Sequence, residues 1–123
     1  MNQARLEHVN LTVSDNDRSV RLLAALTGWE IRWRGPSRMG GETIHLGSDQ
    51  AYLALYQDGG DHSGQDKGRP LNHVGLLVDD LDTAEEVVFA HGLIPFGHDD
   101  YTPGQRFYFF DWDGIEFEVV SYA

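Results

Sequence analysis

The 123-residue chain contains no cysteine, which excludes disulfide bonds, thiolate chemistry and every cysteine-based zinc site. Positive charge is also scarce, because 9 Lys and Arg stand against 20 Asp and Glu, a net charge of -11. This balance disfavours nucleic acid as a partner, since its phosphates would be repelled. No apolar run approaches the length of a membrane span and no export signal is recognisable, so we expect a soluble, cytoplasmic protein.

Two stretches of the sequence repeat each other. Residues 6–13 read LEHVNLTV and residues 71–78 read LNHVGLLV, an offset of 65. A repeat of this length spans a whole supersecondary unit, which indicates a doubled module. The chain is long enough for one domain with a hydrophobic core of its own. We therefore expect a single domain over 1–123, divided into module one (5–57), a linker (58–70) and module two (71–122).

Hydrophobic periodicity predicts the same order of elements in each module, namely a strand, a helix and three strands. The first helix is expected to begin after Ser14 or Asp15, both good caps, and to end at Gly28. The predicted elements are strands 6–13, 29–34, 42–47 and 51–57 with helix 16–26, and strands 72–78, 93–98, 105–111 and 115–122 with helix 81–91. The fold class is therefore α+β, with two βαβββ modules in tandem.

Strand alternation selects candidate metal ligands. The apolar side chains of the first strand share one face, which leaves His8 on the other. His73 is its counterpart in module two, and the same alternation places Glu118 on the open face of the last strand. The counterpart of Glu118 in module one is Ala54, whose side chain cannot bind a metal. Two imidazoles and one carboxylate leave coordination positions open, as in catalytic sites; a metal-free relic of such a site is the alternative.

The repeated Leu-x-His-Val-x-Leu-x-Val openings and the closing stretch FYFFDWDGIEFE resemble the vicinal oxygen chelate superfamily. That group includes glyoxalase I, fosfomycin-resistance enzymes, bleomycin-resistance proteins and type I extradiol dioxygenases. The resemblance implies paired modules whose sheets curl around a cleft, often completed in a homodimer. It also implies a small substrate that chelates a divalent metal through vicinal oxygens. The ligands would be His8, His73 and Glu118, and the metal Fe(II) or Mn(II), with Zn(II) and Ni(II) as alternatives.

Departures from the family patterns separate its subclasses. Ala54 does not match glyoxalase I, and bleomycin-binding members lack the metal ligands altogether. Gly97-His98, followed by Phe107-Tyr108 and the turn before Glu118, resembles the extradiol signature, although Trp112 replaces a proline. Extradiol ring cleavage is therefore the favoured function. The alternatives are a fosfomycin-resistance-type or glyoxalase-like transferase or lyase, and a non-catalytic binding protein of the bleomycin-resistance type.

Five further side chains are candidates for the substrate site. Tyr108 is expected to donate a hydrogen bond to a developing oxyanion, and His98 to act as acid or base. Tyr52, Tyr56 and Phe110 are expected to line the substrate pocket. The competing interpretation for the tyrosines is an aromatic at the rim of the core, and for His98 a surface histidine.

Other polar residues fit the site less well. His45 is out of phase with Ile44 and Leu46, so it lies outside the site if those two line the cleft. His62 lies in the linker, whose composition favours solvent. A phosphonate substrate would need cationic groups, and the available arginines form no recognisable cluster: Arg32, Arg34, Arg38 and Arg106.

Overall fold

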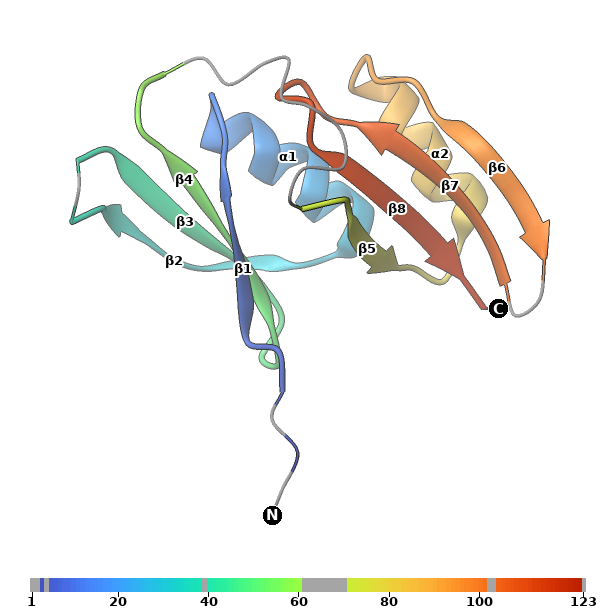
Figure 1. Cartoon of the computed structure of the whole chain (residues 1–123), viewed down its shortest axis with the longest axis horizontal. Coiled ribbons are helices and arrows are strands. Elements are labelled where there is room, and N and C mark those ends of the chain that lie inside the picture. The colour runs from blue at the N-terminus through green and yellow to red at the C-terminus, as the bar shows by residue number, and fades with distance from the viewer. Residues whose placement is uncertain (1–2, 4, 39, 61–70, 102–103, 123) are drawn as a thin grey trace. The chain divides into compact units, whose positions relative to one another are not determined.

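The computed structural model describes residues 3, 5–38, 40–60, 71–101 and 104–122. Most of the predicted linker, including His62, lies outside these residues. The elements, in chain order (Figure 1), are β1 (His8–Thr12), α1 (Asn16–Thr27), β2 (Glu30–Pro36), β3 (Glu42–Gly47), β4 (Tyr52–Gln57), β5 (Val74–Leu77), α2 (Leu81–Ala90), β6 (Phe96–Tyr101), β7 (Gly104–Phe110) and β8 (Glu116–Ser121). The predicted βαβββ order therefore occurs twice.

Each module forms a four-stranded mixed sheet, and the two sheets have the same strand order. The first runs β1-β4-β3-β2 and the second β5-β8-β7-β6. In both sheets the opening strand pairs in parallel with the last strand of the module, and the other pairings are antiparallel. Two mixed sheets with two helices confirm the predicted α+β fold. No helix in the described part of the chain is long and apolar enough to cross a membrane.

The chain divides into two compact units. The first comprises Met1–Ala24 and Gly28–Asp61, and the second comprises Ala25–Thr27 and His62–Ala123. The last turn of α1 therefore belongs to the second unit, although the rest of the helix belongs to the first.

The first unit buries one face of its sheet. Its buried apolar side chains include Leu11, Val13, Leu22, Leu23, Ile44, Leu46, Leu53 and Leu55. α1 begins as predicted at Asp15, whose carboxylate accepts a hydrogen bond from the backbone N–H of Arg18 at 3.1 Å. It ends at Gly28, which adopts the left-handed conformation with φ of 74° that glycine favours. Because side chains alternate along a strand, the residues between the core positions form an open face on the other side of the sheet.

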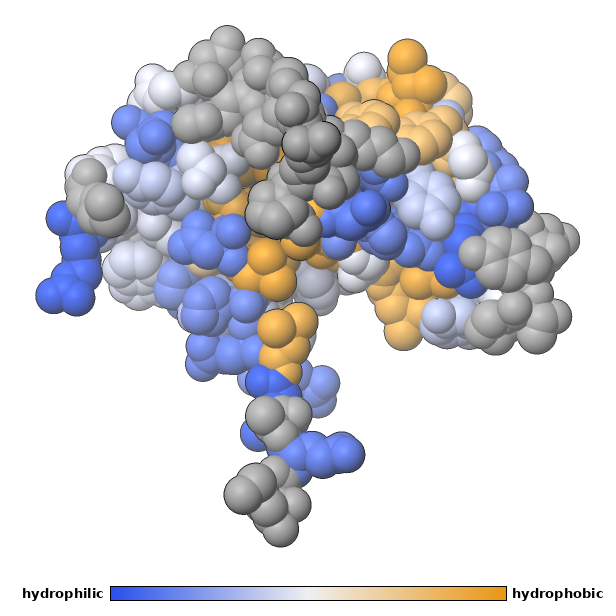
Figure 2. Space-filling view, in the orientation of Figure 1, coloured by the Kyte–Doolittle hydropathy of each residue, from blue (hydrophilic) through white to orange (hydrophobic). Residues whose placement is uncertain are grey.

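The second unit is built in the same way around α2, which lies against β7 and β8. Its most buried apolar side chains are Leu76, Ala84, Val88, Phe107, Phe109, Phe117 and Val119. Asp80 caps α2 by accepting hydrogen bonds from the backbone N–H and the hydroxyl of Thr83, and these bonds lower the pKa of its carboxyl. Apolar side chains are exposed beyond the core, where Figure 2 shows them over the end of α2 and the start of β6; Phe89 and Ile94 are among them.

A tight turn joins β7 to β8 and sets the position of Glu118. The buried carboxylate of Asp111 accepts hydrogen bonds from the backbone N–H groups of Asp113 and Ile115, both at 2.9 Å. Gly114 completes the turn with φ of 83°. A buried side chain just before the Asp113-Gly114 pair thus holds the turn.

Asp111→Ala should lower the free energy of unfolding by about 1–3 kcal/mol, because two buried backbone donors lose their acceptor. Asp111→Asn keeps an oxygen acceptor and should lose less. Urea unfolding of the three proteins measures the difference. If the Ala and Asn variants are equally destabilised, the two hydrogen bonds are not what holds the turn.

Candidate metal centre

The second unit brings two of the three predicted ligands into contact. Nε2 of His73 lies 3.0 Å from Oε1 of Glu118, although the residues are 45 positions apart. The parallel pairing of β5 with β8 causes this, because it places Gly75, two residues after His73, opposite Glu118. The Glu118 side chain is 13% exposed and that of His73 is 33% exposed. The pair therefore forms a partly buried, open-sided site.

The donor atoms and their spacing suit a divalent ion. Two ligand atoms that each lie about 2.1 Å from an ion, at a right angle, are about 3.0 Å apart. The distance between Nε2 of His73 and Oε1 of Glu118 has this value. Imidazole and carboxylate are also ligands that Mn, Fe and Zn ions share. These two of the three predicted ligands therefore have donor atoms and a spacing that fit a metal, and the same distance is that of a hydrogen bond between them.

Each predicted histidine ligand is oriented by the residue that precedes it. Nδ1 of His8 lies 2.8 Å from Oε1 of Glu7, and Nδ1 of His73 lies 2.8 Å from Oδ1 of Asn72. An oxygen acceptor at Nδ1 favours the tautomer that carries its proton there, which leaves Nε2 as the ligand atom. The repeat thus preserves the orientation of the two imidazoles as well as their positions.

The second oxygen of Glu118 is held by an arginine. Nη1 of Arg106 donates to Oε2 of Glu118 at 2.8 Å, and both side chains are nearly buried, with 12% and 13% exposed. Sequence reasoning considered Arg106 only as a phosphonate-binding candidate. The β7–β8 hairpin places Arg106 on the face of Glu118, since Arg106 and Tyr108 share a face and Tyr108 pairs with Glu118, but the contact itself depends on a register that the sequence does not state.

Tyr108 and Phe110 lie on the face of the second sheet that carries Glu118. The ring of Tyr108 meets that of His73 edge-on, with centroids 5.8 Å apart. Phe96 stacks against both Tyr108 and Phe110, at 5.9 and 5.2 Å. The open face therefore joins the polar cluster to an apolar aromatic surface.

His98 lies on the other side of the same sheet. Its Nε2 is 2.5 Å from Oε1 of Glu85 on α2, and its ring stacks on the buried Phe107. A bulge in β6 is responsible. Phe96 pairs with Tyr108 and Asp99 pairs with Arg106, so Gly97 and His98 on β6 lie opposite the single residue Phe107 on β7. The structure therefore separates His98 from Tyr108 and Glu118, with which it was expected to act.

In the first unit a row of rings crosses the open face of the sheet. His8 stacks on Tyr52 with centroids 4.9 Å apart, and Tyr52 stacks on His45 at 4.4 Å. Trp33 continues the row beyond His45 at 4.9 Å. The guanidinium of Arg32 lies over the Tyr52 ring, 4.6 Å from its centroid. His8, a predicted ligand, and Tyr52, a predicted pocket residue, are thus direct neighbours.

His45 belongs to this row. It was expected to lie outside the site only if Ile44 and Leu46 lined the cleft, and they do not. Ile44 and Leu46 are fully buried in the core, which leaves His45 on the face of His8. Tyr56 shares the strand and parity of Tyr52, and its hydroxyl donates to the carbonyl of Gly40 at 3.2 Å.

The two units contribute different ligands. His8 belongs to the first unit, whereas His73 and Glu118 belong to the second. Among the residues that the structure describes, no three His, Asp or Glu side chains form a group able to hold a metal ion. The second unit therefore supplies two of the three predicted ligands.

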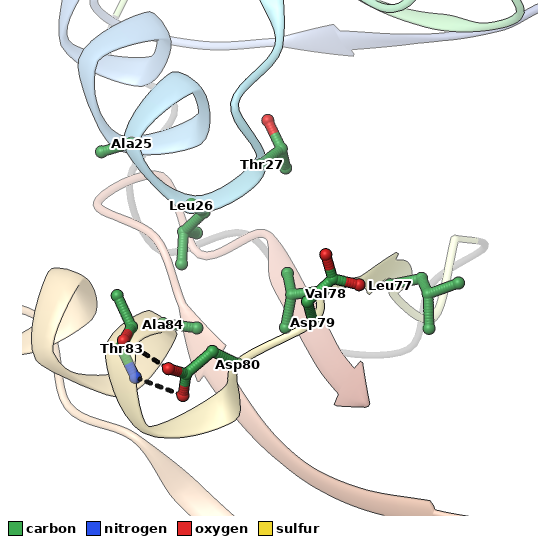
Figure 3. A pocket seen from close by; sticks show the side chains of 9 residues that line it. All are labelled: Ala25, Leu26, Thr27, Leu77, Val78, Asp79, Asp80, Thr83 and Ala84. Carbon is green, nitrogen blue, oxygen red and sulfur yellow. Dashed lines mark hydrogen bonds between the residues drawn. The ribbon is translucent and has the colours of Figure 1, made fainter. Parts of the chain in front are cut away.

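A separate cavity of about 240 Å³ lies in the second unit, between the end of α1 and the start of α2 (Figure 3). None of the predicted site residues lines it. The carboxylate of Asp80, on its wall, is engaged by Thr83 as the helix cap (Figure 3). The cavity therefore has no part in the proposed site.

The chain matches the family model of the Glyoxalase/Bleomycin resistance protein/Dioxygenase superfamily over residues 5–119. It belongs to this superfamily, the vicinal oxygen chelate group that the sequence motifs indicated. No curated protein sequence matches the chain.

Solved structures agree with this assignment. A glyoxylase/bleomycin resistance protein/dioxygenase domain from Frankia sp. EAN1pec is 26% identical, with a TM-score of 0.81 and 98% of each chain covered. The fosfomycin resistance protein FosX from Mesorhizobium loti is 22% identical, with a TM-score of 0.72 over 98% of this chain and 93% of that one. A FosX variant from Listeria monocytogenes, complexed with Mn(II) and 1S,2S-dihydroxypropylphosphonic acid, is 20% identical, with a TM-score of 0.76 over 97% and 90%.

The ring row predicts a pH effect on stability. Burial lowers the pKa of His45, and the nearby His8 and Arg32 add to this. A histidine whose pKa is lower in the folded than in the unfolded state stabilises the fold above its unfolded pKa and loses that contribution as the pH falls. Between about pH 7 and about pH 5, the free energy of unfolding should therefore fall more steeply in the parent than in His45→Gln. Urea unfolding across this range tests the prediction, and parallel curves would contradict it.

Proposed function

We propose that this chain is a metal-dependent enzyme that acts on a small substrate with two adjacent oxygens. His8, His73 and Glu118 hold a divalent ion, with Mn(II) or Fe(II) favoured. The contact of 3.0 Å between His73 and Glu118 is the observation that carries the proposal. The neighbours of the three ligands also support it. Each engages one atom of its ligand, namely Nδ1 of either histidine or Oε2 of Glu118, and leaves the other nitrogen or oxygen for the ion. Membership of the superfamily supports it further.

The favoured substrate is a planar aromatic diol, and the favoured reaction is extradiol ring cleavage, in which both atoms of dioxygen enter the ring-opened product. Stacking supports a planar substrate, since an aromatic ring bound next to His8 would extend the ring row that begins at His8 and continues to Tyr52. The ring of Phe110 and its neighbours add a second aromatic surface. When bound, the ion would act as a Lewis acid toward the diol and would pass electrons from the diol to dioxygen, ending in its starting oxidation state.

Tyr108 has the position of a hydrogen-bond donor in this reaction. It stands across the β7–β8 pairing from Glu118, and its ring meets that of His73. A phenol hydroxyl on this face can donate to an oxyanion that develops on the substrate. His98 has no role in the proposal, because its contacts are with Glu85 on the helix side.

Opening of the epoxide of fosfomycin by water, which gives a dihydroxy phosphonate, is the second candidate reaction. The fold similarity to FosX proteins favours it, one of which binds Mn(II) and a dihydroxy phosphonate. The position of His98 also weakens the one sequence feature that discriminated in favour of dioxygenases.

Two activity assays after anaerobic addition of Fe(II) or Mn(II), together with a measurement of metal binding, separate these functions. Oxygen uptake with a panel of catechols supports ring cleavage, and loss of fosfomycin without oxygen uptake supports the second candidate. Tight binding of a small molecule by a protein that binds no divalent metal would instead identify a bleomycin-resistance-type binding protein and refute the metal-dependent function.

Glu118→Gln should weaken Mn(II) binding by at least about tenfold, because the anionic ligand is lost while the amide oxygen can still accept from Arg106. The matched control is Glu85→Gln, which removes a carboxylate from the helix side of the same sheet. Free Mn(II) is measured by electron paramagnetic resonance during titration, and folding by circular dichroism. Parent-like Mn(II) affinity in a folded Glu118→Gln variant would show that Glu118 is not a ligand.

A further inference from the structure

We infer that Arg106 is a positioning residue of the metal centre, which binds Oε2 of Glu118 and leaves only Oε1 for the ion. The inference rests on the proposed metal-dependent function. Its basis is the division of the carboxylate between two partners. Oε1 of Glu118 faces Nε2 of His73 at 3.0 Å, while Oε2 accepts from Nη1 of Arg106 at 2.8 Å.

The sheet fixes this division. Arg106 pairs with Val120 across the β7–β8 hairpin and Tyr108 pairs with Glu118, so the guanidinium reaches the carboxylate from the neighbouring pair on the same face. The next residue, Phe107, is fully buried in the core on the opposite face and anchors the strand. With only 12% and 13% of the two side chains exposed, water and salt screen this ion pair weakly.

Arg106 thereby restricts how Glu118 can bind an ion. A carboxylate with two available oxygens can bind through both and occupy two coordination positions. With Oε2 held by the guanidinium, Glu118 offers a single oxygen. A coordination position therefore stays available to a substrate that chelates through two oxygens.

Arg106 also changes the charge of the centre. Its guanidinium offsets the carboxylate of Glu118, so a divalent ion held there with two neutral imidazoles retains its full positive charge. A centre of this charge favours an anionic substrate, such as a diol that loses its protons on binding. Arg106 is thus expected to favour chelating anions without contacting them.

Metal affinity alone cannot reveal this role, because two effects of removing Arg106 oppose each other. The loss of orientation weakens binding, whereas the loss of a nearby positive charge strengthens it. The number of water molecules exchanging on bound Mn(II) is a direct readout, since a carboxylate that binds through both oxygens displaces water.

The experiment measures water proton relaxation and the electron paramagnetic resonance spectrum of the Mn(II)-loaded full chain. Arg106→Met should have about one fewer exchanging water than the parent, because Oε2 becomes available to the ion. Arg106→Lys keeps a cationic donor and should restore the parent value. Arg34→Met is the matched control, because it removes an exposed arginine that pairs with Asp17 and Glu42.

A parent-like water number and spectrum in Arg106→Met would overturn the inference and leave Arg106 as a structural ion pair. If that variant does not fold, Arg106→Leu, which also lacks a donor, is measured in its place with the same expected loss of one water. A parent chain that binds no Mn(II) would refute the proposed function and this inference together. A variant that matches a Mn(II)-binding parent refutes the inference alone, so the two failures are distinguishable.

Discussion

Parallel pairing of the opening strand with the closing strand of each module is the constraint on which the other features depend. In the second unit, β5 beside β8 brings His73 to Glu118 across 45 residues of sequence. In the first unit, β1 beside β4 places His8 directly across from Tyr52. Parallel neighbours need a long crossover connection, and here a helix and two further strands supply it. The ligand positions are therefore a consequence of the topology.

The same topology gives the two units different chemistry. Asn10 pairs with Ala54 in the first sheet, and Gly75 pairs with Glu118 at the equivalent place in the second. The first unit has no carboxylate there, and its open face is instead crossed by the ring row that begins at His8. One unit thus carries a carboxylate and an imidazole on its open face, and the other carries an imidazole beside an aromatic surface.

Period-two alternation explains how much of this could be read from the sequence. It predicted the strands to within a few residues and placed His8 and Glu118 opposite the core faces of their strands, because the apolar residues beside each of them alternate with polar ones. His98 shows where alternation fails. Counting from Phe96 by twos places it on the face of Tyr108, but the bulge at Gly97 turns it toward α2. A bulge depends on the register of the partner strand, which a single sequence does not state.

Contacts between side chains were also beyond the sequence. Alternation places Arg106, Tyr108 and Glu118 on one face, yet it does not say that a guanidinium will hold one oxygen of the carboxylate. That contact depends on the β7–β8 register. The turn that Asp111 holds between the two strands sets this register. The prediction for His45 was conditional for a related reason, because its face depends on whether Ile44 and Leu46 belong to the core or to the cleft.

Charge connects Arg106 to the rest of the molecule. At a net charge of -11, the chain as a whole repels anions, and its few cationic side chains are scattered. An anionic chelating substrate therefore needs a local source of positive charge. A divalent ion whose charge is partly neutralised by an unpaired carboxylate ligand would present less net positive charge to the substrate. In the proposed centre, a nearly buried guanidinium on that carboxylate would preserve the charge of the ion, and its burial would keep the effect from being screened. In an acidic chain with nine cationic side chains, this placement gives one arginine more influence on the substrate than a surface position would.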